Sequence, residues 1–241
     1  MRTLAINGSP HAEKGNTALI LGPFLEGMKQ AGAEVELFHT KKMNINPCLG
    51  EYNCWFKTPG VCSQKDDMGE IVPKLMEADI LVFATPVYVD GMTGPMKNLL
   101  DRAIPVGDPV IEMRDGHCRH RAREKVTDGK LVLVSNCGFW ELDSFDPLVV
   151  HLQAVSRNLG REFAGALLRP HGPALKAMMD QGMPVHDILD AAREAGRQLV
   201  KDGRMKPDTL KIVSRDLLPQ QMYVNIANQY AQGRLSASGN E

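Results

Sequence analysis

Short apolar runs recur along the chain at intervals that leave room for a helix between one run and the next. Four runs are clear and a fifth is weaker: residues 4–6, 34–38, 80–84, 131–134 and 163–168. Three are continuously apolar, which is typical of strands that helices cover on both faces. Helical patterns lie between and after the runs, over residues 17–30, 66–77, 94–103, 146–158 and 185–201. The sequence therefore predicts an α/β fold, a doubly wound, five-stranded parallel sheet with helices on both faces.

The last of these helical patterns ends near Gly203, a residue that is expected to stop a helix. We expect residues 1–203 to form one domain and residues 204–241 to form a helical C-terminal extension. The extension contains an amphipathic segment, residues 222–230, that suits packing on the domain or on a second subunit. One residue conflicts with the helical pattern. Pro23 lies inside the first predicted helix, so we expect a kink there or a helix that starts later than Thr17.

Composition excludes several classes of function. The chain has 241 residues, 43% of them hydrophobic, and a formal net charge of −1. It can therefore bury a substantial core, but it has no global field that would attract nucleic acid or an anionic membrane surface. No uncharged apolar run approaches the roughly 18 residues needed to cross a bilayer, and we expect a cytoplasmic protein without a secretory leader. The odd number of cysteines, five, argues against a disulfide scaffold.

The segment after the first run, residues 7–17, is rich in small and hydroxyl-bearing residues and leads into a helix. Backbone N–H groups, side-chain donors and the positive end of that helix together suit a phosphate group. The candidate binding residues are Ser9, His11, Asn16 and Thr17. The spacing matches neither the glycine pattern of a dinucleotide site nor the lysine-containing loop of nucleoside-triphosphate enzymes. The alternative is an ordinary turn that Asn16 caps.

Two further loops follow the third and fourth runs. The carboxyl ends of parallel strands meet at one edge of a sheet, so these loops are expected to lie beside the first one. Their candidate binding residues are Pro86, Val87, Tyr88 and Gly91 in one loop and Asn136, Cys137 and Gly138 in the other. Stiff, proline-containing or glycine-containing loops of this kind can place backbone N–H groups along the edge of a flat heterocycle. Each loop alone is an ordinary connection, and the three together favour a binding site.

Several motifs together resemble the NAD(P)H-dependent FMN reductase family of flavodoxin-like proteins, and within it the iron-sulfur flavoproteins. They are Gly8-Ser9-Pro10 and Gly15-Asn16-Thr17, the run from Thr85-Pro86-Val87-Tyr88 through Met96-Lys97-Asn98 to Asp101-Arg102, and Cys137-Gly138-Phe139. The resemblance extends from residue 1 to about residue 200. It implies a flavodoxin-like sheet that binds FMN, with the phosphate in loop 8–17 and the isoalloxazine ring against residues 85–91 and 136–141.

The resemblance also implies an activity. It is that of an FMN-dependent oxidoreductase that takes hydride from NAD(P)H and passes electrons to a quinone, a flavin, a metal ion or a protein. The loops supply hydrogen-bond donors to the ring, and we assign no catalytic side chain. The family implies a homodimer or homotetramer whose subunits complete the flavin pocket. Two alternatives are an electron-transfer flavoprotein without nicotinamide turnover, in which an altered iron-sulfur site has a place, and a scaffold that has lost its cofactor.

A cysteine-containing segment, residues 45–68, is similar to the compact cluster motif of the iron-sulfur flavoproteins. That motif has four cysteines, and three of them are matched here by Cys48, Cys54 and Cys62, whereas Glu51 stands at the fourth position. A carboxylate is a poor replacement for a thiolate on a 4Fe-4S cluster. We therefore predict no cluster and assign no metal ligand. The alternatives are an altered or labile cluster, a zinc ion and a redox disulfide.

Positive charge is concentrated between the third predicted helix and the fourth apolar run. The residues are Arg114, His117, Arg119, His120, Arg121, Arg123 and Lys125. One interpretation is a dock for the phosphates of NADPH or for an anionic electron acceptor. The other is a solvated loop that Glu112, Asp115 and Glu124 balance.

Overall fold

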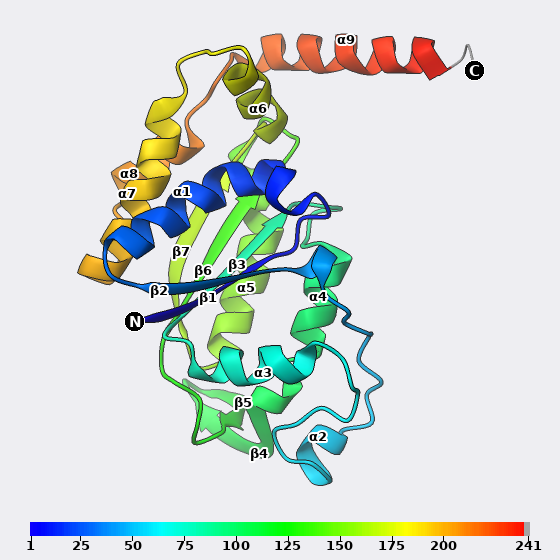
Figure 1. Cartoon of the computed structure of the whole chain (residues 1–241), viewed down its shortest axis with the longest axis vertical. Coiled ribbons are helices and arrows are strands. Elements are labelled where there is room, and N and C mark those ends of the chain that lie inside the picture. Colours follow the sequence, from blue (N-terminus) through cyan, green and yellow to red (C-terminus); the bar gives the residue numbers. More distant parts are fainter. Residues whose placement is uncertain (239–241) are drawn as a thin grey trace.

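Five parallel strands form the central sheet of the computed structural model, which describes residues 1–238 (Figure 1). They are β1 (Arg2–Asn7), β2 (Glu34–His39), β3 (Ile80–Pro86), β6 (Lys130–Asn136) and β7 (Glu162–Arg169). Their order across the sheet is β2-β1-β3-β6-β7, and every neighbouring pair is parallel. This is the flavodoxin-like strand order. The predicted fold class is confirmed.

The helices alternate with the strands along the chain. The α-helices are α1 (Asn16–Gln30), α2 (Asn53–Phe56), α3 (Met68–Glu77), α4 (Gly94–Asp101), α5 (Asp146–Asn158), α6 (Gly172–Asp180), α7 (His186–Asp202), α8 (Pro207–Ser214) and α9 (Gln220–Ser238). Short 3₁₀ turns are η1 (Ala12–Lys14), η2 (Thr40–Lys42), η3 (Ile104–Val106) and η4 (Leu142–Phe145). Within residues 1–238, no helix is long and apolar enough to cross a membrane.

All five predicted strands and all five predicted helices are confirmed, with ends that differ by a few residues. The prediction of a late start for the first helix is wrong, because α1 begins at Asn16 and continues through Pro23 to Gln30. The stretch that was read as a basic loop is also different. It forms a two-stranded antiparallel hairpin, β4 (Gly107–Arg114) and β5 (His117–Ala122). Helix α6 was not predicted.

The sheet is covered on both faces, and each face has its own core. On one face α1, α6, α7 and α8 bury residues such as Phe24 and Leu199 against Val82 and Val132. On the other face α3, α4 and α5 cover Phe83 and its neighbours. Successive strand residues point to opposite faces, so both kinds of position in the central strands must be apolar. This is the physical reason for the continuous apolar runs.

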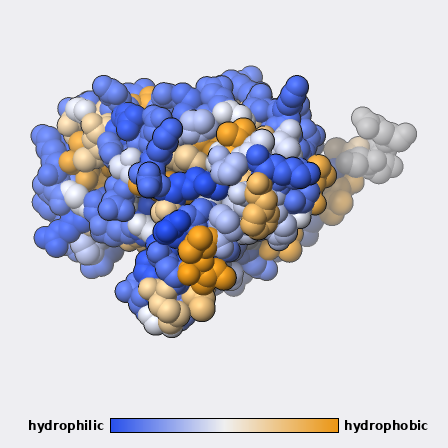
Figure 2. Space-filling model, turned by 90° about the horizontal axis from the view of Figure 1, so that it is seen from below, coloured by the Kyte–Doolittle hydropathy of each residue, from blue (hydrophilic) through white to orange (hydrophobic). Residues whose placement is uncertain are grey.

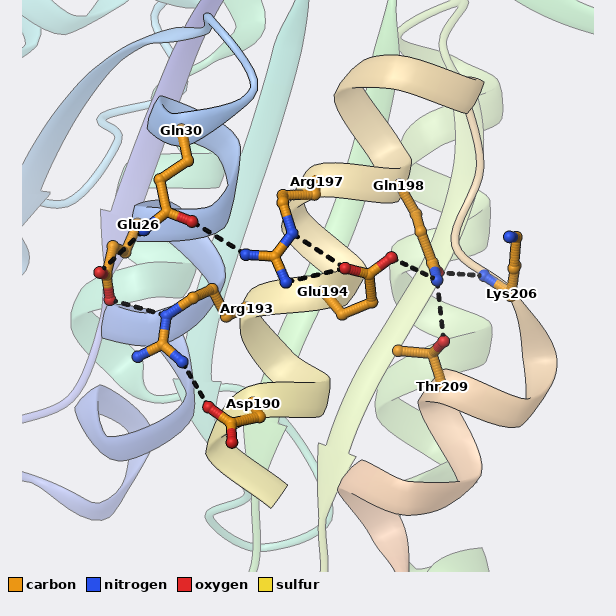
Figure 3. Close-up of polar contacts among 9 residues, drawn as sticks. All are labelled: Glu26, Gln30, Asp190, Arg193, Glu194, Arg197, Gln198, Lys206 and Thr209. Carbon is orange, nitrogen blue, oxygen red and sulfur yellow. Dashed lines mark hydrogen bonds and ion pairs between the residues drawn. The ribbon is translucent and has the colours of Figure 1, made fainter. Parts of the chain in front are cut away.

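Two glycines set the packing of α1 on α7. A Cβ atom on Gly27 would lie 1.8 Å from the carbonyl oxygen of Arg193, and one on Gly196 would lie 2.1 Å from that of Phe24. The two helix backbones therefore touch. Around this contact, Arg193 pairs with Glu26 at 3.0 Å, and the Arg197 guanidinium donates to the side-chain oxygen of Gln30 at 2.9 Å (Figure 3). These polar contacts frame an apolar helix interface.

The C-terminal extension divides into a packed part and a projecting part. Helix α8 contacts α7 and β7, and its Val213 is fully buried. Helix α9 extends away from the body of the molecule (Figure 1). Most of α9 is exposed, including Met222, Ile226 and Tyr230. Residues 239–241 of the predicted extension lie outside the described residues, and the division of the chain at residue 203 stays a prediction.

The glycine contact generates a stability prediction. Gly27→Ala should lower the free energy of unfolding by at least about 2 kcal/mol, because the new methyl group meets backbone that cannot move aside cheaply. Gly22→Ala is the matched control on the same helix, since a Cβ there meets nothing within 4 Å. It should raise stability by up to about 1 kcal/mol, the difference in helix propensity between the two residues. Urea unfolding followed by circular dichroism measures both, and equal effects would contradict the packing argument.

Candidate functional site

Three loops meet at the carboxyl edge of the sheet, and hydrogen bonds join them. The Thr17 hydroxyl donates to the side-chain oxygen of Asn136 at 2.5 Å, which links the first loop to the third. The Val87 N–H donates to the Asn136 carbonyl at 2.8 Å, which links the second loop to the third. The Thr93 hydroxyl donates to the Gly8 carbonyl at 2.8 Å and links the first two. The structure thus brings the three predicted loops together as one unit.

The first loop is built around a buried side chain that the sequence analysis did not select. Asn7 ends β1, accepts a hydrogen bond from the Ser9 N–H at 2.9 Å and donates to the Ala12 carbonyl at 3.2 Å. The loop wraps so closely that a Cβ on Gly15 would lie 2.5 Å from the Ser9 hydroxyl oxygen. Of its predicted binding residues, Ser9 and Thr17 are buried, Asn16 is half-buried and His11 is exposed. The first N–H groups of α1 have no acceptor inside the helix, so this end can receive an anion.

The second loop turns back on itself at its tip. Tyr88 and Gly91 exchange backbone hydrogen bonds of 2.9 and 3.1 Å, and the two residues between them have positive φ angles, +48° at Val89 and +59° at Asp90. That conformation costs a β-branched residue on the order of 1–3 kcal/mol. The Val89 side chain is 99% exposed and Tyr88 is about half exposed. Pro86 at the base is buried, so the loop is anchored below and open above.

The third loop is held from the side of the neighbouring strand. The carbonyl of Cys137 accepts from the Gly172 N–H at 2.9 Å, and that of Phe139 accepts from the His171 N–H at 2.7 Å. Cys137 itself is buried, and burial raises the pKa of its thiol. It is therefore a packed thiol at neutral pH. Gly138 and Phe139 are exposed, and the Gly138 carbonyl accepts a hydrogen bond from the Tyr223 hydroxyl of α9.

A buried polar cluster behind the third loop was missed by the sequence analysis. Arg169, which is fully buried, donates to the carbonyls of Pro170, Val213 and Arg215, and its pKa is lowered to about 10 by burial. His171 stacks on Trp140 with ring centroids 6.2 Å apart. A signal was available, because both residues lie at or just after the end of the fifth strand. The predicted binding residues all lie in the loops after the first, third and fourth runs.

The site has the chemistry that FMN requires. A singly phosphorylated group suits the first loop for three reasons. The loop leads into a helix N-terminus, it contains the buried Ser9 hydroxyl, and it has no room for side chains at Gly8 and Gly15.

A flat ring requires open, stiff loops. The second loop offers such a surface, although the Val87, Tyr88 and Gly91 N–H groups are bonded within the protein. The exposed Gly138–Phe139 segment of the third loop is the candidate source of N–H donors. The residues therefore fit FMN at this edge of the sheet.

The cysteine segment surrounds a small cavity. Cys48, Cys54, Cys62 and Glu51 all line it, together with Arg102. Burial raises the pKa of the Cys54 thiol, and the nearby acidic groups add to that effect. The Glu51 carboxylate accepts a hydrogen bond from the Ser63 hydroxyl at 2.6 Å. Among the described residues, no group of three or more His, Cys, Asp or Glu side chains is arranged to hold a metal ion.

These residues do not fit a cluster with four thiolate ligands. Three thiols and one hydrogen-bonded carboxylate line the cavity, and the remaining two cysteines lie elsewhere. Cys118 is exposed on the β4–β5 hairpin, and Cys137 belongs to the third loop. Arg102 closes the base of the cavity with a fully buried pair to Asp66, with bonds of 2.8 and 2.9 Å.

The basic segment lies at the other end of the sheet. The hairpin follows α4 and leads into the start of β6, where the Lys130 N–H donates to the Asp79 carbonyl at 2.9 Å. A strand of this length separates it from the three loops by roughly 20 Å. Arg114, Arg119 and Arg157 line a cavity of about 690 Å³ there. Figure 2 views the molecule from this end, and the face is mostly hydrophilic. The geometry places this charge apart from the candidate flavin site.

Comparison with known proteins identifies related sequences. A family model described as NADPH-dependent FMN reductase matches residues 1–145, more than half of the chain. An iron-sulfur flavoprotein of Archaeoglobus fulgidus is 44% identical over 103 residues, which are 43% of this chain and 49% of the relative. An iron-sulfur flavoprotein of Methanocaldococcus jannaschii is 37% identical over 106 residues, 44% of this chain and 53% of the relative. The matched segments span about half the length of these curated relatives.

Solved structures share the fold. An FMN-dependent NADH-azoreductase from Bacillus anthracis, solved in complex with FMN, superposes with a TM-score of 0.61 at 14% identity, covering 83% of this chain and 99% of that one. An NAD(P)H:quinone oxidoreductase from Methanothermobacter marburgensis gives a TM-score of 0.59 at 19% identity, covering 83% and 96%. At these identities the likeness is one of fold.

The buried histidine generates a pH prediction. Burial and the neighbouring Arg169 lower the pKa of His171 from 6.5 to about 4. The unfolded chain therefore binds a proton that the folded chain does not, and stability should decrease by about 3 kcal/mol as pH falls from 6.5 to 4. In His171→Gln, an amide oxygen can still accept a hydrogen bond from the Leu217 N–H, but it does not titrate. The free energy of unfolding should therefore depend less steeply on pH in this variant. Urea unfolding at several pH values measures it, with the exposed His186→Gln as control. If the free energy of unfolding changes with pH equally in wild type and His171→Gln, the loss of stability at low pH does not come from His171.

The cysteine cavity generates a second prediction. We expect the wild-type chain, purified without oxygen, to contain less than stoichiometric iron and acid-labile sulfide, because a carboxylate occupies one ligand position. Glu51→Cys should take up both after reconstitution and acquire broad visible absorption in addition to any flavin. Glu70→Cys, at an exposed position on α3, is the matched control. Stoichiometric iron and sulfide in the wild type would show the interpretation of Glu51 to be wrong.

Proposed function

Because the chain belongs to the NADPH-dependent FMN reductase family, we propose that it is an FMN-dependent oxidoreductase. It takes hydride from NAD(P)H and passes electrons to a quinone, a flavin, a metal ion or a protein acceptor. The observation that carries this proposal is the group of three loops joined by hydrogen bonds at the carboxyl edge of the sheet. Ligands of doubly wound sheets bind outside this edge.

The first loop would hold the phosphate of FMN. The N-terminal N–H groups of α1 and the half-buried Asn16 amide would be donors to the phosphate, and the buried Ser9 hydroxyl belongs to the same loop. Thr17, the second residue of α1, also donates its hydroxyl to Asn136, so it links the first loop to the third.

The second and third loops would hold the ring. Bound FMN would accept the hydride on its ring, and the reduced ring would carry negative charge on its pyrimidine side. Backbone N–H groups preorganised on that side stabilise such charge without moving during the reaction. The Gly138 and Phe139 N–H groups of the third loop are suited to this role. Pro86, Val87 and Gly91 of the second loop would border the ring, and the half-exposed Tyr88 would lie at its open side.

The electron balance is simple. NAD(P)H loses a hydride, that is one proton and two electrons, and leaves as NAD(P)⁺. The same two electrons then pass to the acceptor, together with protons where the acceptor requires them. No side chain of this chain is needed as a nucleophile or as a general base, which agrees with a site made chiefly of backbone donors.

We also propose that the working form is a homodimer or a homotetramer. Support comes from α9, which exposes about half or more of Met222, Ile226, Tyr230 and Leu235. A projecting helix with uncovered apolar side chains is poorly stable alone, because isolated helices gain most of their stability from packing. A second subunit would cover them.

The purified protein should be yellow, and its flavin absorption should disappear when NADH or NADPH is added without oxygen.

The placement of the FMN phosphate in the first loop predicts a ratio of affinities. Wild type should bind FMN much more tightly than riboflavin, and Asn16→Ala combined with Ser9→Ala should reduce that ratio about tenfold or more, because each lost bond to a charged group contributes about 1.5–3 kcal/mol. Fluorescence titration measures both ligands, and Asn228→Ala on exposed α9 serves as control.

The possible outcomes separate the alternatives. If dithionite bleaches the flavin absorption and NAD(P)H does not, the protein is an electron-transfer flavoprotein and not an NAD(P)H-dependent reductase. A colourless protein that binds neither flavin would remove the proposed function as a whole. If the ratio of FMN to riboflavin affinity is unchanged in the double variant, the first loop does not bind the phosphate.

A further inference from the structure

Three successive carbonyl groups of the third loop are engaged on the same side. The Cys137 and Phe139 carbonyls accept from the backbone N–H groups of Gly172 and His171. The carbonyl between them, that of Gly138, accepts from the Tyr223 hydroxyl. The ring centroids of Tyr223 and His171 are 5.5 Å apart. The Tyr223 hydroxyl and the two backbone N–H groups therefore approach the third loop from neighbouring positions.

This arrangement orients the N–H groups of the same peptide units. A trans peptide bond places its C=O and N–H on opposite sides. Fixing the carbonyls of Cys137 and Gly138 therefore directs the N–H groups of Gly138 and Phe139 away from the Tyr223 side. Successive N–H groups that point the same way form a concave anion-binding surface. The Tyr223 hydroxyl thus controls the orientation of the Phe139 N–H.

Tyr223 differs from the other two donors. Those are backbone groups at the start of α6, whereas Tyr223 is a side chain from α9, 85 residues along the chain from the group that it binds. Burial raises the pKa of its phenol, and the acidic groups of Cys137 and Glu141 add to the effect, so the hydroxyl keeps its proton and remains a donor at neutral pH.

Three neighbouring contacts hold the start of α9 and the residues just before it in place. The Trp140 indole N–H donates to the Leu218 carbonyl at 2.9 Å, and the Gln220 amide donates to the Glu141 carboxylate at 2.6 Å. The Leu217 N–H donates to the buried His171 ring at 3.0 Å. The start of α9 is therefore joined to the third loop at several points, while the rest of the helix is exposed.

We propose that Tyr223 is a positioning residue for the flavin ring: its hydroxyl holds the Gly138–Phe139 peptide so that the Phe139 N–H faces the ring. The C-terminal extension is then part of the cofactor site, although it lies outside the strands and loops of the sheet. This inference rests on the proposed function, because it requires FMN at the third loop.

The test compares Tyr223→Phe with Tyr230→Phe in the full-length chain. Each substitution removes one phenolic oxygen from α9, and Tyr230 is 72% exposed. The readouts are the dissociation constant of oxidised FMN and the two-electron reduction potential of bound FMN. Loss of a donor to the reduced ring should weaken the binding of reduced FMN about tenfold more than that of oxidised FMN. Tenfold corresponds to a potential about 30 mV more negative.

The outcomes are distinct. A more negative potential in Tyr223→Phe, with Tyr230→Phe equal to wild type and both unfolding as wild type does, supports the proposal. An unchanged potential in Tyr223→Phe overturns it and leaves the FMN assignment intact. A wild-type protein that binds no FMN removes the proposed function instead, so the two failures are distinguishable.

A second measurement covers the case in which Tyr223→Phe does not fold. Hydrogen exchange on the wild-type chain, with and without FMN, reports directly on the amides concerned. FMN should slow the exchange of the Gly138 and Phe139 amides, whereas the amides of residues 226–232 on α9 should not respond. In wild-type protein that fluorescence titration shows to be saturated with FMN, equal exchange at Gly138 and Phe139 with and without FMN would overturn the proposal.

Discussion

Helices α1 and α7 can pack on the sheet as they do because Gly27 and Gly196 have no side chains. A methyl group at either position would enter the backbone of the opposing helix. This close approach seats α1 against the sheet along its length. The start of α1 is therefore fixed at the carboxyl edge, where its unpaired N–H groups face the first loop. The anion-binding end of the site depends on a contact near the other end of the same helix.

The candidate site is held together more by backbone and amide groups than by charged side chains. Asn136 receives the Thr17 hydroxyl on its side chain and the Val87 N–H on its carbonyl, so one residue links all three loops. Asn7 organises the first loop in the same manner. The Asn7 amide is engaged at both its oxygen and its nitrogen, and the Asn136 amide at its oxygen, which restrains both side chains. A cofactor would then meet donors that are already oriented, which is the condition for electrostatic stabilisation without reorganisation.

Much of the fold was predictable from the sequence, because strands buried on both faces leave continuous apolar runs such as Ile80–Pro86. The hairpin β4–β5 was not, since it is mostly exposed and rich in charged residues that pair within the hairpin itself, as Arg121 of β5 does with Asp108 of β4. Its charges therefore looked like those of a solvated loop. The edge of the sheet that carries the site was predictable from topology, since loops that follow parallel strands converge.

The contacts within the site were less predictable. His171 and Tyr223 come together only because α8 and the start of α9 return across the end of β7, and no local pattern encodes that return. Thr17 was expected to face a ligand, but its hydroxyl is engaged with Asn136. Spacing along the chain indicates which loops meet. It does not indicate which donor in a loop is already occupied.

The tip of the second loop has one further consequence. Val89 has the backbone conformation of a glycine or asparagine and a side chain almost wholly in water. In the isolated chain this position weakens the fold and buries nothing in return. If FMN binds against the second loop as proposed, this exposed isopropyl group would be an apolar contact for molecules that approach the ring from that side.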